Sequence, residues 1–355
     1  MNKKKILIRT GKVTPNSSME NYLDNCIKPL AYSLKNCGYK VVFHSNIEVD
    51  GFDSIPLRFK SRKGIKHLVG MFFDEIQISL YKLLSKEQFF ILSMNQLVPN
   101  ILCAKKSIMV IHDIMPLEYS NHWPMLHKYY KYYLGTMLKK CKAIVTVSET
   151  TKNKLIDYYG LSSNNITTIY NGIKFKSTEK IGGGMQEESP FIYVGANLPN
   201  KNLEFLVDVF SKVNNSNQLH MIGGCCKNEK VIEASKYNKN IKLLGYVSEN
   251  ELEKQYRECK ALIFPSISEG FGLPLIEAMW YGKPIIVADR DYAREVCNDY
   301  PVTYFNDKDS EELVHIVNNS GFCSPKTMGT SRKHLLKKYS WGTAVNRFFN
   351  LIKGI

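Results

Sequence analysis

Residues 261–288 have the sequence ALIFPSISEGFGLPLIEAMWYGKPIIVA, and this stretch predicts the fold. The apolar runs 261–265 and 284–288 have the length of buried strands. Residues 273–281 between them have helical character, and Gly282 suits the left-handed position that ends a helix. A strand, a helix and a second strand in this order make a βαβ unit, whose two strands are parallel. The stretch therefore predicts an α/β domain built on a parallel sheet.

The same alternation of strands and helices extends along the chain in both directions. Ser17-x-x-Glu20 and Ser248-x-x-Glu251 are capping boxes that predict helix starts, and Ser148 is a third N-cap. Gly38 is expected to end the first helix. Further strands are predicted at residues 5–9, 39–44, 89–93, 107–112, 143–147, 166–170, 191–195, 218–222 and 241–244. The chain is therefore expected to be of the α/β class, with doubly wound sheets.

Length and charge indicate two domains. The chain has 355 residues, more than one compact core usually supports. Residues 174–189, KFKSTEKIGGGMQEES, are polar and glycine-rich, which is typical of a linker or exposed loop. Residues 1–170 carry 24 Lys and Arg against 12 Asp and Glu, and the remaining residues carry 24 against 21. We therefore expect domains at 1–173 and 190–340, joined by 174–189.

Composition narrows the class of protein. Apolar residues make up 44%, and no run reaches the ~18 apolar residues of a spanning helix. Nine cysteines without metal-ligand spacing, and no signal peptide, predict a cytoplasmic protein with free thiols. The basic first half favours an anionic lipid or a pyrophosphate-linked acceptor, or is simply a solvated surface. No nucleic-acid-binding motif accompanies it, so nucleic acid is not expected as a partner.

Two basic or amphipathic stretches in the first half have two interpretations. Residues 66–86 are expected to be helical, with one apolar face formed by Leu68, Phe72, Ile76, Leu80 and Leu83. Residues 123–142 are rich in Tyr and Lys. Each is either a helix that covers the sheet with its apolar face, the interpretation we favour, or a surface that contacts a membrane peripherally.

The loop and helix at 265–279 carry the chemistry. Gly270 and Gly272 allow the backbone to approach a ligand closely, and a helix that opens at Leu273 favours an anion at its N-terminus. Glu269 and Glu277 can accept hydrogen bonds from vicinal sugar hydroxyls. Since glycine-rich turns also occur as purely structural turns, the pattern alone leaves both interpretations open.

A resemblance makes the functional interpretation more specific. The spacing of Glu269 and Glu277 resembles the E-x7-E motif of glycosyltransferase family 4, whose members are retaining enzymes with the GT-B fold of two Rossmann-like domains facing across a cleft. Segments that resemble the same family in the same order are IHDIMPL at 111–117, AIVTVSETTKNKL at 143–155, IYNGI at 169–173, YVGANLPNKNLEFLV at 193–207, LGYVSENEL at 244–252, GKPIIVAD at 282–289 and YSWGTAVNRF at 339–348. Residues 1–104 match only as a Rossmann pattern.

The resemblance implies roles for individual residues. Glu277 corresponds to the glutamate that holds the donor ribose, Glu269 to one near the hydroxyls of the transferred sugar, and Lys201 to the lysine that neutralises the diphosphate. His112 corresponds to a histidine near the anomeric centre, although an ordinary turn-capping role beside Asp113 is the alternative. Further expected donor contacts are Tyr246, Val247, Gly270, Phe271, Gly272 and Leu273. The resemblance also implies that residues 341–355 pack back on the N-terminal domain.

The expected function is transfer of a sugar from a nucleotide-diphosphate sugar to a glycan or polyprenyl-linked acceptor, in bacterial surface polysaccharide synthesis. The reaction would be retaining and metal-independent, with no cofactor.

Two alternatives remain open. The family usually has an arginine at the position of Ala196 or of Asn200, so the chain is alternatively a degenerate, non-catalytic partner subunit. The D-x-D triplets at 289–291 and 307–309 are the basis of the other alternative, a metal-dependent transferase.

Overall fold

The protein is described by a computed structural model that covers residues 4–57 except 16, 64–84, 89–96, 101–173, 188–323 except 215, and 335–355 except 336. The chain divides into two compact units. Met1–Gly172 and Ser340–Ile355 form the first unit, and Ile173–Tyr339 form the second. Most of the linker predicted at 174–189 lies outside the described residues.

The described part of the first unit contains one parallel sheet of seven strands, in the order β3-β2-β1-β4-β5-β6-β7. Its strands are β1 (Lys5–Gly11), β2 (Lys40–Ser45), β3 (Asp53–Pro56), β4 (Phe89–Ser93), β5 (Ser107–Ile111), β6 (Ala143–Thr146) and β7 (Ile166–Thr168). Its helices are α1 (Ser18–Tyr22), η1 (Leu23–Ile27), α2 (Lys28–Asn36), α3 (Gly64–Leu84), η2 (Ile101–Lys106), α4 (Met115–Glu118), α5 (Pro124–Tyr129), η3 (Tyr130–Leu134), α6 (Gly135–Leu138), α7 (Glu149–Tyr159), η4 (Ser163–Asn165) and α15 (Trp341–Lys353).

The described part of the second unit contains a parallel sheet of six strands, in the order β10-β9-β8-β11-β12-β13. Its strands are β8 (Phe191–Val194), β9 (Leu219–Ile222), β10 (Ile241–Gly245), β11 (Ala261–Phe264), β12 (Ile285–Ala288) and β13 (Thr303–Phe305). Its helices are η5 (Pro199–Lys201), α8 (Leu203–Lys212), η6 (Gly224–Lys227), α9 (Glu229–Tyr237), α10 (Glu249–Glu258), α11 (Leu273–Trp280), α12 (Asp291–Cys297) and α13 (Ser310–Asn318). Both sheets therefore have the strand order of a Rossmann fold.

Local sequence signals account for where several helices begin and end. The hydroxyls of Ser17, Ser148 and Ser248 each accept a hydrogen bond from a backbone N–H three residues on, as the capping patterns predict. Gly38 has a φ of +85°, which a residue with a side chain rarely adopts. The edge strands β3 and β13 were not predicted, because short edge strands carry few of the apolar residues that mark a buried strand.

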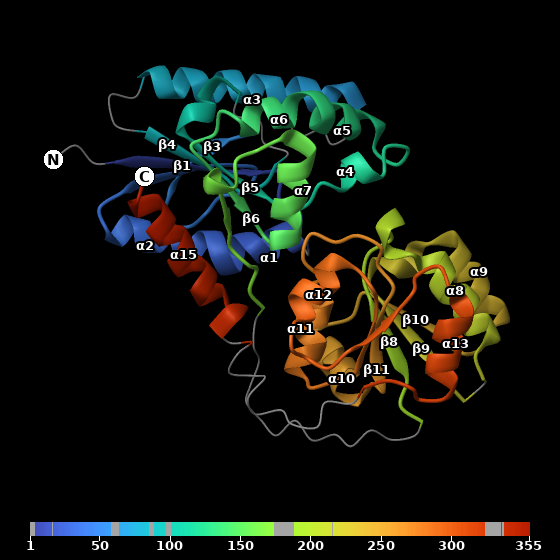
Figure 1. The fold of residues 1–355 in the computed structure, drawn as a ribbon. Coiled ribbons are helices and arrows are strands. Elements are labelled where there is room, and N and C mark those ends of the chain that lie inside the picture. Colours follow the sequence, from blue (N-terminus) through green and yellow to red (C-terminus); the bar gives the residue numbers. More distant parts are fainter. Residues whose placement is uncertain are drawn as a thin grey trace. The chain divides into compact units, whose positions relative to one another are not determined.

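The first sheet is covered on both faces (Figure 1). On one face, Ile6 and Ile8 pack against α2 and against the apolar side of α15, which includes Trp341 and Phe348. On the other face, Leu7 of β1 packs with Ile78 of α3. Helix α15 thus belongs to the first unit although it is the last element of the chain.

Helix α3 is oriented opposite to our expectation. The apolar side of residues 66–86 was expected to cover the sheet, but Phe72 is 62% exposed and Leu80 is 54% exposed. The inner side of the helix instead carries Asp74 and Glu75, which are buried. The stretch does form a helix that covers the sheet, as the favoured interpretation predicts. The side expected to face inward was wrong, because polar groups of the sheet, rather than apolar ones, select the side of α3 that faces it.

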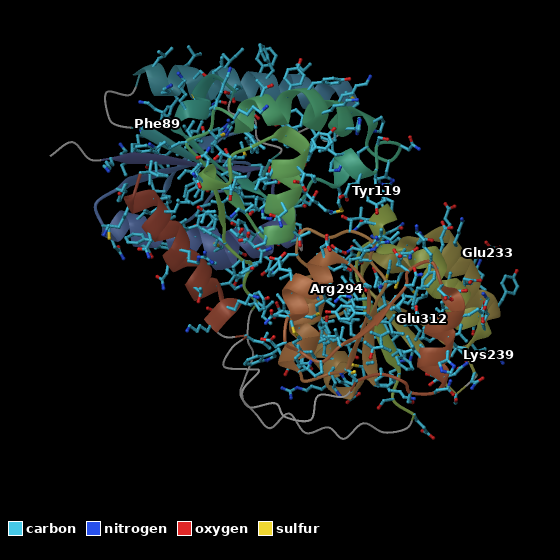
Figure 2. All side chains as sticks on the ribbon, viewed as in Figure 1. Phe89, Tyr119, Glu233, Lys239, Arg294 and Glu312 are labelled. Atoms are coloured by element: carbon cyan, nitrogen blue, oxygen red, sulfur yellow. The ribbon has the colours of Figure 1, made fainter. Side chains whose placement is uncertain are left out.

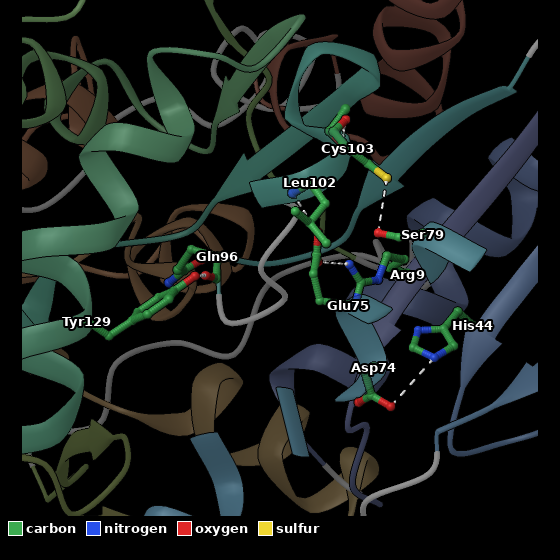
Figure 3. A network of polar contacts seen from close by, with 10 residues as sticks. Arg9, His44, Asp74, Glu75, Ser79, Gln96, Leu102, Cys103 and Tyr129 are labelled. Atoms are coloured by element: carbon green, nitrogen blue, oxygen red, sulfur yellow. Dashed lines mark hydrogen bonds and ion pairs between the residues drawn. The ribbon is translucent and has the colours of Figure 1, made fainter. Parts of the chain in front are cut away.

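Those polar groups lie at matched positions of two neighbouring strands (Figure 3). Arg9 of β1 is only 1% exposed, and its Nη1 donates a hydrogen bond of 3.1 Å to Oε2 of Glu75. His44 of β2, its register partner, lies with Nε2 3.9 Å from Oδ1 of Asp74. Burial lowers the pKa of His44 to about 3, so this ring is neutral at physiological pH. Oε1 of Glu75 also accepts the backbone N–H of Leu102.

We expect Glu75→Ala to lower the free energy of unfolding of the first unit by about 3 to 5 kcal/mol, because it leaves the Arg9 guanidinium buried without its carboxylate. Chemical denaturation measures this. Glu118→Ala, which removes the more exposed ion pair with Lys154, is the control and should cost less than about 1 kcal/mol. Equal losses in the two variants would contradict the role assigned to Glu75.

Candidate functional site

The second sheet reverses its strand order between β8 and β11, which are neighbours. After β8 and after β11 the chain crosses over towards opposite sides. The loops that follow the two strands therefore diverge and leave room at the carboxyl end of the sheet. Those loops are residues 195–202 and 265–272. They contain Lys201 and Glu269, which sequence analysis had proposed separately.

Lys201 and Glu269 are in direct contact. Nζ of Lys201 lies 2.5 Å from Oε1 of Glu269, and the two side chains are only 11% and 9% exposed. The ammonium group also lies 5.4 Å from the centre of the Phe264 ring, at the end of β11. A buried cation is thus held next to a carboxylate at the point where the fold places ligands.

Asn200 organises this contact, and sequence analysis missed its role. It is completely buried, and its Nδ2 donates to the carbonyl oxygen of Ser268 at 2.7 Å and more weakly to Oε1 of Glu269 at 3.4 Å. The main-chain carbonyl oxygen of Asn200 accepts the backbone N–H of Ile267 at 2.8 Å. The side chain that stands where the family usually has an arginine therefore fastens the two loops together.

Three buried polar atoms on these segments have no hydrogen-bond partner among the described residues. They are the hydroxyl oxygens of Tyr193 and Ser266 and Oδ1 of Asn200. Buried polar atoms in folded proteins are nearly all satisfied by protein, ligand or ordered water. Their concentration around the two loops fits a site that receives a polar ligand.

Helix α11 starts directly after the glycine loop. Its N-cap, Gly272, has a φ of +98° and no side chain to cap the first turn. A Cβ at this position would also approach Cδ1 of Leu275 to 3.2 Å, so glycine is required. The positive end of the helix dipole and its N–H groups favour an anion here.

Glu277 is held one turn into the same helix. The hydroxyl of Tyr256, on α10, donates a hydrogen bond of 2.7 Å to Oε2 of Glu277. Burial raises the pKa of Glu277, and the bond from Tyr256 acts in the opposite direction. Tyr256 is the other functional candidate that sequence analysis missed, since a tyrosine inside an amphipathic helix gives no sign of its partner.

The loop after β10 contributes Tyr246 and Val247. Tyr246 is 71% exposed, and Nζ of Lys227 lies 5.3 Å from the centre of its ring. A Cβ on Gly224 would meet the Tyr246 hydroxyl at 2.9 Å and Cα of Ala196 at 3.4 Å. This glycine therefore lets the loops after β8, β9 and β10 approach one another.

His112 follows β5 in the first unit. Its Nε2 lies 2.9 Å from the carbonyl oxygen of Met94, so Nε2 carries the proton. Burial lowers the pKa of His112, and the ring is therefore neutral, with Nδ1 as its acceptor. Its ring packs edge-on against Tyr22 at 4.9 Å. Oδ1 of Asp113 accepts the N–H of Met115 at 3.0 Å. This contact is the turn capping of the alternative interpretation, and it involves the side chain of Asp113 only.

The D-x-D triplets have other partners. Asp289 forms two hydrogen bonds, of 2.6 and 2.7 Å, with Arg294 of α12, which is labelled in Figure 2. Asp307 pairs with Arg290, and Asp309 caps α13 through the N–H of Glu312. Within the described residues, no group of three or more His, Cys, Asp or Glu side chains is arranged to hold a metal ion.

Of the predicted donor residues, Lys201, Glu269, Gly270 to Leu273 and Glu277 lie on two neighbouring loops and the helix that follows them. Tyr246 and Val247 lie on the loop after β10 of the same sheet. His112 belongs to the first unit.

Two family models match successive parts of the chain. The model described as Glycosyltransferase Family 4 matches residues 26–176, and that described as Glycosyl transferases group 1 matches residues 177–319.

Two curated relatives illustrate the range of similarity. The O-antigen chain mannosyltransferase RfbU of Salmonella typhimurium is 30% identical over 220 residues, which are 61% of this chain and 61% of that protein. The poly(ribitol-phosphate) alpha-N-acetylglucosaminyltransferase of Staphylococcus aureus is 24% identical over 235 residues, 62% of this chain and 45% of that one. The matched region thus spans about three-fifths of the length of the first of these relatives, and less of the second.

Solved structures agree over the whole chain. Anabaena Alr3699/HepE, solved in complex with UDP-glucose, has a TM-score of 0.74 at 14% identity and covers 99% of this chain and 100% of that one. The lipopolysaccharide outer core galactosyltransferase WaaB has a TM-score of 0.71 at 16% identity, with 99% of each chain covered. The two family models, the two Rossmann-like sheets and these structural matches lead to one conclusion: the chain belongs to glycosyltransferase family 4, the group 1 glycosyl transferases, and has the GT-B fold.

Proposed function

We propose that the protein is a retaining glycosyltransferase that moves a sugar from a nucleotide-diphosphate sugar to a glycan or polyprenyl-linked acceptor. The observation that carries the proposal is the buried contact between Lys201 and Glu269, at the switch point of the second sheet and beside the N-terminus of α11. The relatives named as an O-antigen chain mannosyltransferase and a poly(ribitol-phosphate) alpha-N-acetylglucosaminyltransferase support a role in bacterial surface polysaccharide synthesis.

The donor would bind along the loops of the second unit. Lys201 and the N–H groups of Gly270 to Leu273 supply positive charge and donors for the diphosphate. The Glu277 carboxylate accepts the ribose hydroxyls, while Tyr246 and Val247 border the base. The structural neighbour HepE, solved in complex with UDP-glucose, supports a nucleotide-sugar as the ligand.

The contact between Lys201 and Glu269 suggests how the donor engages. A diphosphate is a stronger anionic partner for Lys201 than one carboxylate, so donor binding would draw the ammonium away from Glu269. The freed carboxylate would then accept hydroxyls of the sugar. Lys201 would stabilise the nucleotide diphosphate as it leaves, where electrostatic stabilisation matters most.

In the proposed reaction, the bond between the anomeric carbon and the phosphate oxygen breaks as the acceptor oxygen forms its bond on the same face of the sugar. The acceptor's proton passes to the departing phosphate oxygen. The neutral His112 side chain orients the sugar through hydrogen bonding instead of supplying charge. The proposal includes no metal and no cofactor, since lysine and the helix N-terminus take the place of a metal's charge.

The protein is proposed to act in the cytoplasm, with peripheral contact at the inner face of the membrane where lipid-linked acceptors lie. Within the part of the chain that the structure describes, there is no helix of the length and apolar character needed to cross a bilayer.

The donor site is tested by a thermal-shift screen with UDP, GDP, dTDP and ADP, with and without EDTA. We expect one nucleotide to raise the melting temperature equally in both conditions, because the diphosphate contacts are made by the protein alone. Glu277→Ala should abolish the shift, while Glu233→Ala, at an exposed position on α9 labelled in Figure 2, should keep it. A shift that requires a divalent cation would favour the metal-dependent alternative. Stabilisation without any donor turnover would favour the degenerate partner subunit.

As the pH is lowered, the affinity for nucleotide should begin to fall at a higher pH than a glutamate of ordinary pKa would predict. Glu277 must be ionised to accept ribose hydroxyls, and its raised pKa means that protonation begins at higher pH. Tyr256→Phe removes the hydrogen bond that lowers this pKa, so the midpoint of the binding curve should move further up. Isothermal titration calorimetry at a series of pH values measures the binding curves of wild type and of Tyr256→Phe. Glu277→Gln is the control and should bind weakly without this pH dependence; identical midpoints for wild type and Tyr256→Phe would refute the assignment.

Asn200 is expected to act as a positioning residue. Asn200→Ala releases the loop that carries Glu269, and we expect the rate constant kcat for donor hydrolysis to fall about 10- to 100-fold. Asn200→Asp should be worse, since it replaces a donor to Ser268 with a carboxylate beside Glu269. If both variants lose activity only in proportion to a lower melting temperature, the role of Asn200 is purely structural.

A further inference from the structure

Helix α3 presents its apolar side to solvent. Val69, Phe72, Phe73, Leu80 and Leu83 are all exposed, and Leu83 is 80% exposed. At 100° per residue these five side chains fall on one side of the helix, and Asp74 and Glu75 fall on the other. Single exposed apolar residues are ordinary, but a continuous apolar side of a helix marks an interaction surface. We call these five residues the outer face of α3.

The orientation of α3 is fixed from inside. Arg9 donates to Glu75, and His44 lies beside Asp74 (Figure 3). Ile78, on the same side of the helix, is fully buried against the sheet. Rotating the helix to bury its outer face would leave the Arg9 guanidinium in the interior without a carboxylate, which is strongly unfavourable. The outer face therefore cannot be hidden by a small adjustment of the unit itself.

The elements next to α3 are basic and aromatic. The short helix η2 packs against both α3 and α6, and it carries exposed Leu102, Lys105 and Lys106. Helices α3 and α6 cover the same face of the first sheet (Figure 1). Just before α6, Tyr132 and Tyr133 are exposed on η3. Residues 88–112 and 119–148 together contain seven lysines and no Asp or Glu, with Asp113 and Glu118 in the segment between them, so these stretches of the chain are basic.

Charge distinguishes the possible occupants of this surface. A second copy of the chain would bring the same lysines against these ones, and residues 1–170 already carry 24 basic against 12 acidic residues. An anionic bilayer complements the lysines, takes up the apolar side chains and suits exposed tyrosines at its polar boundary. We infer that the outer face of α3, with the neighbouring lysines of η2, docks on the surface of a bilayer that contains anionic lipid.

The docked helix lies on the membrane and does not cross it, because the opposite side of α3 remains bound to the first sheet through Arg9 and Glu75. The inference adds a membrane-attachment surface to the proposed function. It rests on that function only for the purpose of the attachment, which is to bring the first unit to a lipid-linked acceptor. The binding itself depends on no residue of the donor site.

Co-sedimentation with vesicles tests the inference. The full-length protein is mixed with vesicles of phosphatidylcholine alone or of phosphatidylcholine and phosphatidylglycerol, at low and high salt. We expect binding to the mixed vesicles and little to phosphatidylcholine alone, with salt weakening the binding. The double variant Phe72→Ser and Leu83→Ser should reduce partitioning into mixed vesicles about tenfold or more. Tyr237→Ser removes an even more exposed aromatic ring, 85% exposed, from α9 of the second unit and should bind like wild type.

A second variant, with Lys105→Gln and Lys106→Gln, should lower the affinity at low salt and reduce its salt dependence. Melting temperature and donor hydrolysis without vesicles should be unchanged in every variant. The inference is overturned if wild type does not bind the mixed vesicles, or if the serine double variant binds as well as wild type. It is also overturned if sedimentation velocity finds a wild-type dimer that the serine variant converts to monomer, since a second copy would then cover the face. Failure of the nucleotide screen with vesicle binding intact would count against the proposed function alone.

Discussion

The second unit depends on a constraint at the centre of its sheet: a lysine and a glutamate from two loops meet where β8 and β11 diverge. Neither charge is readily solvated there, so each requires the other until a ligand replaces it. Asn200 holds the loops at the separation that this contact needs, and α11 adds the positive end of its dipole from the same side. The glycine loop, the helix start and the ion pair therefore form one arrangement, and a change in one displaces the others.

The first unit is built around a second buried ion pair with a different consequence. Arg9 and Glu75 contribute little net stability over an apolar pair of the same size, since both lose hydration on burial. Burial lowers the pKa of Arg9 and raises that of Glu75, because in each residue the loss of hydration disfavours the charged form. What the pair determines is orientation. It selects which side of α3 faces the sheet, and so leaves the apolar side outside.

Local signals in the sequence predicted much of the fold. The strand at residues 89–93 agrees with β4, and the serine caps lie at the helix starts that were expected. These features depend on a few neighbouring residues, as do the glycine loop and the spacing of Glu269 from Glu277. Asn200 and Tyr256 were missed because each acts through a partner distant in the sequence, 69 positions away in the contact of Asn200 with Glu269 and 21 in that of Tyr256 with Glu277.

The sequence by itself therefore determined the α/β class, the order of strands and helices, and the residues that resemble a donor site. Tertiary structure alone decided which of those residues touch, which hydrogen bonds hold them, and which way α3 faces. The physical reason is that helical periodicity defines an apolar side but contains no information about what lies opposite it. Arg9 and His44, from two strands brought together by the sheet, supply that information only when the chain has folded.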